Sequence, residues 1–203
     1  MLRLLGVLSA TALFQTLAAE NVRLVNGDIL LTLQNKQEIQ ITHDGLNREA
    51  VLSPDGSKIA YLRGVSSDKT ELVVVEVGAA GVRPILTLIG PIPVRVGRLP
   101  LRGALAWSPD SESVYFLLEF SSTSNYIGRL TVASGKVRGL CDAISYFVLQ
   151  HGKYAGKLVA LKRRHTLVSV WDWYWLIDET GAEIGPIGDR EALSEFIDRF
   201  EVR

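Results

Sequence analysis

The sequence contains a single cysteine, Cys141, among its 203 residues. This excludes an internal disulfide framework and a metal site built from four cysteine ligands. The chain also lacks an excess of charge of one sign, since 22 basic residues balance 22 acidic ones. A protein that binds nucleic acid through a strong basic field needs positive charge to neutralise phosphates, so we expect no nucleic-acid partner. The remaining class is a globular chain of about one domain.

Familiar catalytic and cofactor motifs are also absent from the sequence. It contains no Gly-x-Ser-x-Gly elbow, no His-Glu-x-x-His pair, no phosphate loop and no dinucleotide fingerprint. The three histidines, His43, His151 and His165, have no spacing typical of a metal site. We therefore expect no catalytic residues, no metal site and no cofactor.

Residues 1–19 are organised like a secretory signal peptide. Arg3 precedes an apolar run over residues 4–14, and small residues follow at the end of the segment. The run of 11 residues is much shorter than the roughly 20 that a membrane-spanning helix needs. A buried amphipathic helix is the alternative, but the run has no polar stripe at helical spacing. The sequence predicts an exported, periplasmic protein whose mature part begins at Glu20, without stable membrane insertion.

The rest of the chain has the pattern of short β-strands separated by turns. Asn26-Gly27 is a strong hairpin signal, because both residues of such a turn must accept positive φ. Many short strands at even spacing indicate an all-β architecture. Only the end has a helical pattern, where Asp189 can cap a helix over residues 189–203. The expected strands are 22–25, 28–33, 37–42, 49–52, 58–62, 71–77, 82–86, 103–107, 114–118, 126–132, 136–140, 144–149, 157–163, 168–177 and 182–187.

An internal repeat indicates the fold. Ser53-Pro54-Asp55 and Ser108-Pro109-Asp110 each stand between two apolar strands, and the two copies are 55 residues apart. Proline sets φ for such a turn, and aspartate can accept a hydrogen bond from its own downstream backbone. A third, degenerate unit over residues 144–187 lacks Ser-Pro-Asp but keeps the strand order. A four-stranded unit repeated along a chain is the signature of β-propeller blades.

The pattern apolar-Ser-Pro-Asp-(Gly)-x-x-apolar resembles the Pro-Asp (SPDG-type) propeller repeat of the TolB family, over residues 37–140. The same repeat occurs in the propellers of dipeptidyl-peptidase-type enzymes. The resemblance implies an exported, usually periplasmic scaffold that binds other proteins, including envelope proteins. The chain departs from TolB because it lacks a separate amino-terminal α/β domain and has far fewer repeats. The peptidase likeness implies no catalysis, because a hydrolase domain would need far more residues than remain.

We predict an all-β fold, a partial or small β-propeller of about three to four four-stranded antiparallel blades with a short C-terminal helix. Residues 20–188 form the propeller-type domain, and residues 189–203 form the helix packed on it. Propellers typically close with about four to eight blades. Unless the strands over residues 22–42 complete a fourth blade, the arc stays open. Open strand edges invite pairing with another chain, so the sequence predicts a dimer or an obligate partner.

The segment from Gly90 to Arg102 lengthens the first repeat beyond the roughly 40 to 45 residues of common propeller repeats. It contains three prolines and three arginines, Arg95, Arg98 and Arg102. One interpretation is a connecting loop that covers a sheet edge. The other is a semi-rigid basic arm that contacts a partner.

Three tryptophans, Trp171, Trp173 and Trp175, fall on one face of an expected strand, because side chains alternate along a strand. They either pack between blades or under the helix, or they form an aromatic platform for a protein or a glycan. Their exposure to solvent discriminates between these interpretations.

Two smaller features also have alternative interpretations. Residues 162–165, Lys-Arg-Arg-His, are expected to form a solvated hairpin end, with contact to anionic lipid or cell-wall polymer as the alternative. Cys141 is expected to be a buried small apolar residue, with a reactive thiol as the alternative.

Three functions follow from these features. The first is an exported, non-catalytic protein-binding module or scaffold, including an inhibitor or immunity-type binder, whose partner is an envelope protein or a second copy of the chain. The second is a glycan or small-ligand binder that uses the Trp171, Trp173 and Trp175 strand. The third, which the residues favour least, is a hydrolase with a non-standard site.

Overall fold

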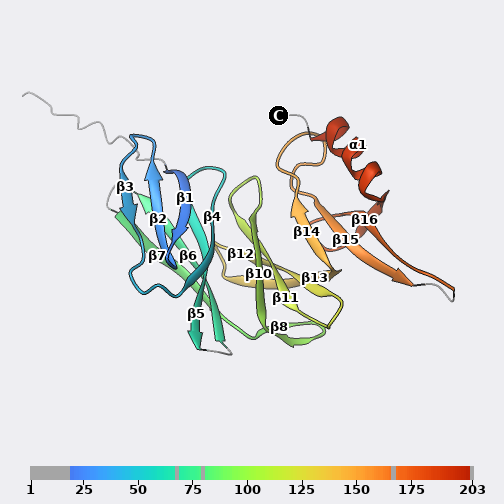
Figure 1. Ribbon diagram of the computed structural model, residues 1–203, viewed down its shortest axis with the longest axis horizontal. Coiled ribbons are helices and arrows are strands. Elements are labelled where there is room, and N and C mark those ends of the chain that lie inside the picture. The colour runs from blue at the N-terminus through green and yellow to red at the C-terminus, as the bar shows by residue number, and fades with distance from the viewer. Residues whose placement is uncertain (1–18, 67–68, 79–80, 166–167, 202–203) are drawn as a thin grey trace, which may run out of the picture.

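The computed structural model describes residues 19–66, 69–78, 81–165 and 168–201. In these residues the strands form three four-stranded antiparallel sheets, a three-stranded sheet and a two-stranded hairpin, followed by one helix (Figure 1). The predicted all-β fold with a short C-terminal helix is confirmed. The expected signal peptide falls almost wholly outside the described residues. No helix in the described part of the chain is long and apolar enough to cross a membrane.

Each four-stranded sheet is one propeller blade, in which the strands follow one another across the sheet in chain order. The first blade contains β4 (Asn47–Leu52), β5 (Lys58–Ser66), β6 (Lys69–Gly78) and β7 (Gly81–Ile89). The second contains β10 (Leu101–Trp107), β11 (Ser113–Glu119), β12 (Asn125–Thr131) and β13 (Lys136–Ala143). The third contains β14 (Ser145–Val148), β15 (Leu158–His165), β16 (Val170–Ile177) and β17 (Glu183–Gly188).

The remaining elements flank these blades. A three-stranded sheet precedes the first blade, and a small hairpin lies between the first and second blades. The helix follows the third blade directly (Figure 1). These elements are β1 (Ala19–Val25), β2 (Asp28–Leu33), β3 (Glu38–Gln40), β8 (Ile92–Val94), β9 (Gly97–Leu99) and α1 (Arg190–Phe200).

The blades pack face to face through apolar side chains. Between the first and second blades, Leu62 and Leu72 pack in one cluster with Trp107 and Phe116. The Trp107 indole N–H also donates to the carbonyl oxygen of Val51 at 3.1 Å, so a polar bond joins the same two blades. A second cluster between the second and third blades includes Tyr115, Leu117, Ile127, Leu158, Ala160 and Ile177. This is the packing expected of a propeller, in which neighbouring blades bury each other's faces.

At the amino-terminal end, β1–β3 cover the outer face of the first blade. Ile29 and Leu31 of β2 are fully buried and pack in one cluster with Ile59 and Val73 of the blade. On the opposite face of this small sheet, Arg23 forms an ion pair with Glu38 at 2.7 Å. No other described strand pairs with β1–β3, so these three strands cover the first blade without completing a four-stranded fourth blade.

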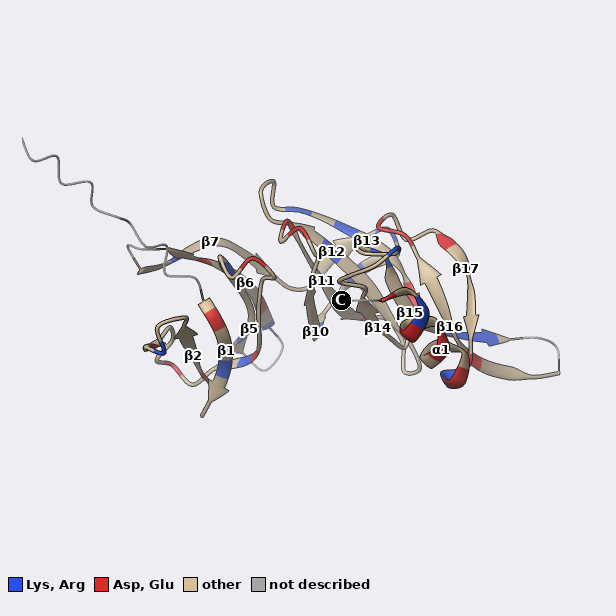
Figure 2. Ribbon diagram, turned by 90° about the horizontal axis from the view of Figure 1, so that it is seen from above, with Lys and Arg blue, Asp and Glu red and all other residues tan. Residues whose placement is uncertain are grey.

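At the other end, α1 covers the outer face of the third blade. Asp189 begins the helix as predicted, and its carboxylate accepts hydrogen bonds from the N–H groups of Glu191 and Ala192 at 3.1 and 3.0 Å. Apolar residues on one side of α1 pack against Val159 and Leu176, while charged residues mark the helix in Figure 2. Both end faces of the open arc are thus covered within the chain. Self-association is therefore not needed to bury these two faces.

Candidate functional site

The Ser-Pro-Asp turns connect the two inner strands of the first and second blades. In the first turn, Ser53 Oγ donates to the Asp55 carboxylate at 2.6 Å, and the same carboxylate accepts the Ser57 N–H at 3.0 Å. Partial burial raises the pKa of Asp55, but the hydrogen bonds from Ser53 and Ser57 outweigh it and lower the pKa to about 2. This turn is a rigid structural device, and its carboxylate is already fully used by its own neighbours.

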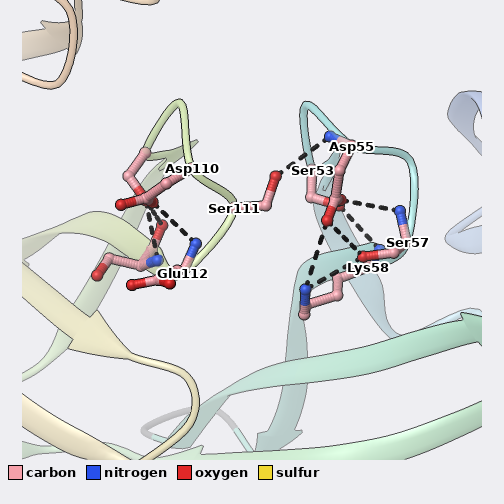
Figure 3. Close-up of polar contacts among 9 residues, drawn as sticks. Ser53, Asp55, Ser57, Lys58, Asp110, Ser111 and Glu112 are labelled. Carbon is pink, nitrogen blue, oxygen red and sulfur yellow. Dashed lines mark hydrogen bonds and ion pairs between the residues drawn. The ribbon is translucent and has the colours of Figure 1, made fainter.

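The second turn repeats this arrangement. Ser108 Oγ donates to the Asp110 carboxylate, which also accepts the Glu112 N–H at 3.0 Å. The two turns also contact each other, because the Asp55 N–H donates to Ser111 Oγ at 3.1 Å (Figure 3). The turns therefore align neighbouring blades, and we assign them a structural role.

The segment from Gly90 to Arg102, expected to be a loop or an arm, contains the small hairpin β8–β9. Ile92 is fully buried between the first two blades. Val94 packs against Gly139 of β13 so closely that a Cβ atom on that glycine would lie 2.9 Å from the Val94 Cβ. The hairpin is thus anchored on the second blade through apolar contacts. It covers part of the blade, as expected of a connecting loop, and it is held in place, as expected of a semi-rigid arm.

A groove of about 600 Å³ separates the hairpin from the outer strand of the second blade. Its floor includes four consecutive residues of β13, Val137–Leu140. Arg95 and Pro93 border it from the hairpin, and Thr180 borders it from the β16–β17 turn. We call this site the β13 groove.

Two of the chain segments that border the β13 groove contain basic residues but no acidic ones. The sequence has no Asp or Glu between Glu76 and Asp110, and none between Glu119 and Asp142. The basic residues of these two segments are Arg83, Arg95, Arg98, Arg102, Arg129, Lys136 and Arg138. Arg95, Lys136 and Arg138 are exposed, and within the described residues none of the three forms an ion pair. These three basic side chains therefore have no ion-pair partner among the described residues at the groove, although Asp178 and Glu179 directly precede Thr180 in the turn that borders it.

The three arginines predicted for the arm lie in different places relative to the β13 groove. Arg95 borders the groove, where Arg138 joins it from β13. Arg98 instead donates to the Pro91 carbonyl oxygen at 3.1 Å, within its own hairpin. Arg102 is exposed on β10 and does not line the groove. Sequence reasoning missed Arg138, although the two segments without carboxylates, read together, were a signal that could have indicated it.

The tryptophans all lie on one face of β16, but they have different environments. Trp175 packs against the cluster between the second and third blades, and the Arg164 guanidinium lies 4.4 Å from its ring centroid. Trp173 is 41% exposed, and its ring meets that of Trp171 edge-on at 6.3 Å. One tryptophan therefore packs between blades, and two lie toward the solvent-facing end of the β15–β16 hairpin.

Lys162 was expected at a solvated hairpin end, and the structure corrects this expectation. Its side chain is only 3% exposed and pairs with Glu183 at 2.8 Å and with Asp142 of the second blade at 3.6 Å. Burial lowers the pKa of Lys162, but the hydrogen bond that Lys162 donates to Glu183 and the neighbouring charges outweigh it and raise the pKa overall. The sequence pattern missed this because partners from other strands are not visible in a local run of charges. Lys162 is thus a charged structural link between blades.

Cys141 lies in the same inter-blade region and is buried. Burial raises the pKa of its thiol, so the thiolate that a reactive cysteine needs is disfavoured. The environment matches a small apolar packing residue.

A second cavity, of about 330 Å³, lies between the second and third blades. Its charged groups already have partners: Lys157 pairs with Glu179, and Arg129 donates to Ser113 Oγ at 3.1 Å. Asp110 belongs to the turn described above. Among the residues that the structure describes, no group of three or more His, Cys, Asp or Glu side chains could hold a metal ion. The β13 groove is therefore the better candidate site.

Comparison with solved structures identifies the fold. TolB from Acinetobacter baumannii matches 86% of the chain over 41% of its own length, with a TM-score of 0.54 and 13% identity. The β-propeller domain of the trilobed protease from Pyrococcus furiosus, described as having an open velcro topology, matches 84% of the chain over 57% of its length, with a TM-score of 0.53 and 14% identity. The chain has the fold of an open β-propeller segment.

Peptidases are also among the structural matches. Dipeptidyl peptidase 4 from Porphyromonas gingivalis matches 83% of the chain over 31% of its own length, with a TM-score of 0.57 and 11% identity. The chain thus spans between 31% and 57% of these three proteins. No protein-family model and no curated protein matches the sequence. At these identities the likeness establishes the propeller relationship alone.

Proposed function

We propose that the chain is an exported, non-catalytic protein-binding module. The observation that carries the proposal is the β13 groove, where basic side chains without an ion-pair partner among the described residues border the outer strand of the second blade. Binding would use shape and charge complementarity on a scaffold whose own end faces are already covered. The TolB-like fold supports this role, since the family resemblance implies an exported scaffold that binds envelope proteins.

The proposal includes the absence of a catalytic activity. The charged groups of the cavity between the second and third blades are committed to internal pairs, and burial disfavours the Cys141 thiolate. The sequence also lacks the motifs that position a nucleophile or a metal. These observations support binding over hydrolysis.

Export is tested by the mass of the chain recovered from cells. We expect cleavage near residue 19, and an intact amino terminus recovered only from the cytoplasm would contradict export. Ala19 pairs with Leu33 in β1 and is 7% exposed, so the exact cleavage position decides whether this contact is kept.

The binding role is tested by quantitative capture from envelope extract after chemical cross-linking. An unrelated exported propeller of similar size and charge is the control bait. We expect a partner in stoichiometric amount with this chain and not with the control, followed by direct measurement of the affinity with the purified pair. Recovery of no stoichiometric partner under several extraction conditions would contradict the proposal.

A glycan or small-ligand binder is the second candidate, and the exposure of Trp173 favours it. Aromatic rings that face solvent can stack on sugar rings, although the edge-on contact with Trp171 gives no flat platform. Tryptophan fluorescence titrated with soluble cell-wall fragments tests this candidate, with Trp173→Phe as the matched variant. A signal that fragments do not change excludes this role for the strand.

A further inference from the structure

The outermost strands of the three blades differ in one property. Within the described chain, β7, β13 and β17 each pair with a strand on one side only. β7 contains Pro84 and β17 contains Pro186, whereas β13 contains no proline. Proline lacks the N–H that a further strand would need, so it protects a sheet edge from pairing. The edge of β13 is the one that lacks this protection.

The β13 groove runs along this edge, which contains no proline. Among described residues, the backbone of Val137–Leu140 makes no hydrogen bond with any segment other than β12. Four extended residues cover about 13 Å, which is long enough to pair with a short added strand in a fixed register. The hairpin residue Val94 limits the groove on one face, and Thr180 limits it on the other. Gly181 of the β16–β17 turn packs against the Leu140 backbone and Val94 packs on Gly139, so these contacts bound the channel at its Leu140 end. Within the channel, the outer backbone groups of β13 have no hydrogen-bond partner from another described segment.

Charge indicates what kind of strand this channel accepts. Arg95 borders one side of the edge, and Arg138 projects from the other face of β13, where its cross-strand neighbour is Arg129. The blue segments of β13 lie along one margin of the molecule in Figure 2. In the neighbouring β16–β17 turn, Glu179 forms an ion pair with Lys157, whereas Asp178 accepts hydrogen bonds from the neutral N–H and O–H groups of Thr180 and keeps its negative charge. A carboxylate supplied from outside would face Arg95 and Arg138, neither of which forms an ion pair among the described residues.

The same charges disfavour a second copy of the chain as the occupant. Two β13 edges placed side by side would bring arginine and lysine residues together, and like charges on adjacent strands are destabilising. Positive charge on an edge is one of the devices by which proteins prevent self-pairing. The segment before residue 19 has one arginine and no acidic residue, so it offers no charge complementarity either.

We propose that the β13 groove binds an extended acidic segment of a partner protein, which adds to the second blade as a fifth strand. The backbone of Val137–Leu140 would supply the ladder hydrogen bonds, and Arg95 and Arg138 would select acidic side chains on the two faces. This inference rests on the proposed protein-binding function and names the site and the chemistry of the partner.

The test uses a fluorescein-labelled peptide of about eight residues in Val-Glu-Glu-Val order, so that each face of an extended strand carries glutamate. Two matched peptides replace glutamate with lysine, or place proline at the centre. Three forms of the protein are compared: the wild-type chain, the groove variant Arg95→Glu/Arg138→Glu and the control variant Lys69→Glu/Arg190→Glu. The control variant changes the net charge by the same amount at exposed positions away from the groove. Fluorescence anisotropy measures binding, and amide hydrogen exchange measures protection of residues 137–140.

We expect the glutamate peptide to bind the wild-type chain and to protect residues 137–140 from exchange. Charge reversal in the groove should weaken binding by at least about tenfold, whereas the control double variant should change it by less than about twofold. The lysine and proline peptides should bind at least about tenfold more weakly than the glutamate peptide. Circular dichroism of both double variants checks that the fold is retained.

Several outcomes would overturn the inference. These are no binding of the glutamate peptide, equal binding by both double variants, equal binding of the proline peptide, or protection that appears elsewhere. Binding of anionic lipid vesicles through Arg95 and Arg138 without peptide binding would also overturn it, in favour of a membrane surface. If the envelope partner is captured equally well by Arg95→Glu/Arg138→Glu, the protein-binding function stands and the groove is not its site.

Discussion

Glu49 accepts the backbone N–H of Ala104 at 2.9 Å, and Ala104 occupies the same position as Glu49 one repeat later. Both residues have left-handed backbone conformations, with φ of 58° and 56°. Each lies at a register shift of the innermost strand of its blade. A bulge leaves N–H groups outside the strand ladder, and the first blade supplies the carboxylate that accepts those of the second.

Replacing Glu49 with Gln should therefore loosen the joint between the first two blades. The carboxylate accepts N–H groups from both Ala104 and Leu105, and hydrogen bonds to charged groups contribute about 1.5–3 kcal/mol each. We expect Glu49→Gln to lower the free energy of unfolding by about 1–3 kcal/mol in urea denaturation. Glu76→Gln, which affects an exposed ion pair with Arg83, should change it by less than about 1 kcal/mol. Equal effects of the two substitutions would contradict this assignment.

Local chemistry explains which parts of the fold could be predicted from the sequence. The Asn26-Gly27 turn has φ values of 53° and 80°, and β2 covers the expected residues 28–33. The Ser-Pro-Asp turns also close as expected, because proline and aspartate act on their own neighbours. Such features depend on residues a few positions apart, and so they are visible in the sequence.

Features made by distant segments could not be predicted in this way. The β13 groove joins Arg95 to Arg138, two residues more than forty positions apart whose proximity depends on how β8–β9 folds back. Lys162 is buried and forms ion pairs with Asp142 and Glu183, which belong to two other strands. The strands over residues 22–42 had an ambiguous role, since only packing decides between a fourth blade and a covering sheet.

The first Ser-Pro-Asp turn should make stability depend on pH in the acid range. Partial burial raises the pKa of Asp55, but hydrogen bonds from Ser53 and Ser57 lower it from 3.8 to about 2 in the folded chain. Because the folded pKa lies below the unfolded one, the ionised carboxylate stabilises the fold above about pH 4, and this contribution is lost as the pH falls toward 2.

The test compares Asp55→Asn with the wild-type chain over this pH range by urea denaturation. We expect the variant to be less stable at pH 7 and the difference to shrink as the pH falls through the acid range. Asp198→Asn, at an exposed position on α1, is the control and should show no such convergence. A difference that is constant between pH 7 and 2 would mean that the carboxylate charge does not stabilise the turn.

The helix α1 should prevent copies of the chain from associating through the third blade. Phe196 of α1 stacks on Tyr154 at 5.5 Å between ring centroids and packs in the cluster that includes Leu176. Phe196→Asp places a charge in this contact, so α1 should detach and expose the apolar face of the blade. We expect the free energy of unfolding to fall by about 2–4 kcal/mol and the mass from light scattering to rise with concentration.

Ser194→Asp adds the same charge on the exposed side of α1 and should leave both properties unchanged. The wild-type chain should remain a monomer, because both of its end faces are covered. A wild-type dimer that Phe196→Asp leaves intact would show that the interface lies away from α1. A dimer that the substitution dissociates would place the helix itself in the interface.

The tryptophans of β16 should separate into a structural residue and an accessible one. Trp175 packs against the cluster between the second and third blades, whereas Trp173 is 41% exposed. Removing a large packed ring leaves a cavity, so we expect Trp175→Ala to lower the free energy of unfolding by about 2–3 kcal/mol. Trp173→Ala should change it by less than about 1 kcal/mol, because a surface ring leaves no cavity. If Trp173→Ala lowers the free energy of unfolding as much as Trp175→Ala does, the Trp173 ring is buried in solution. A bound partner or a second copy of the chain would then cover that face.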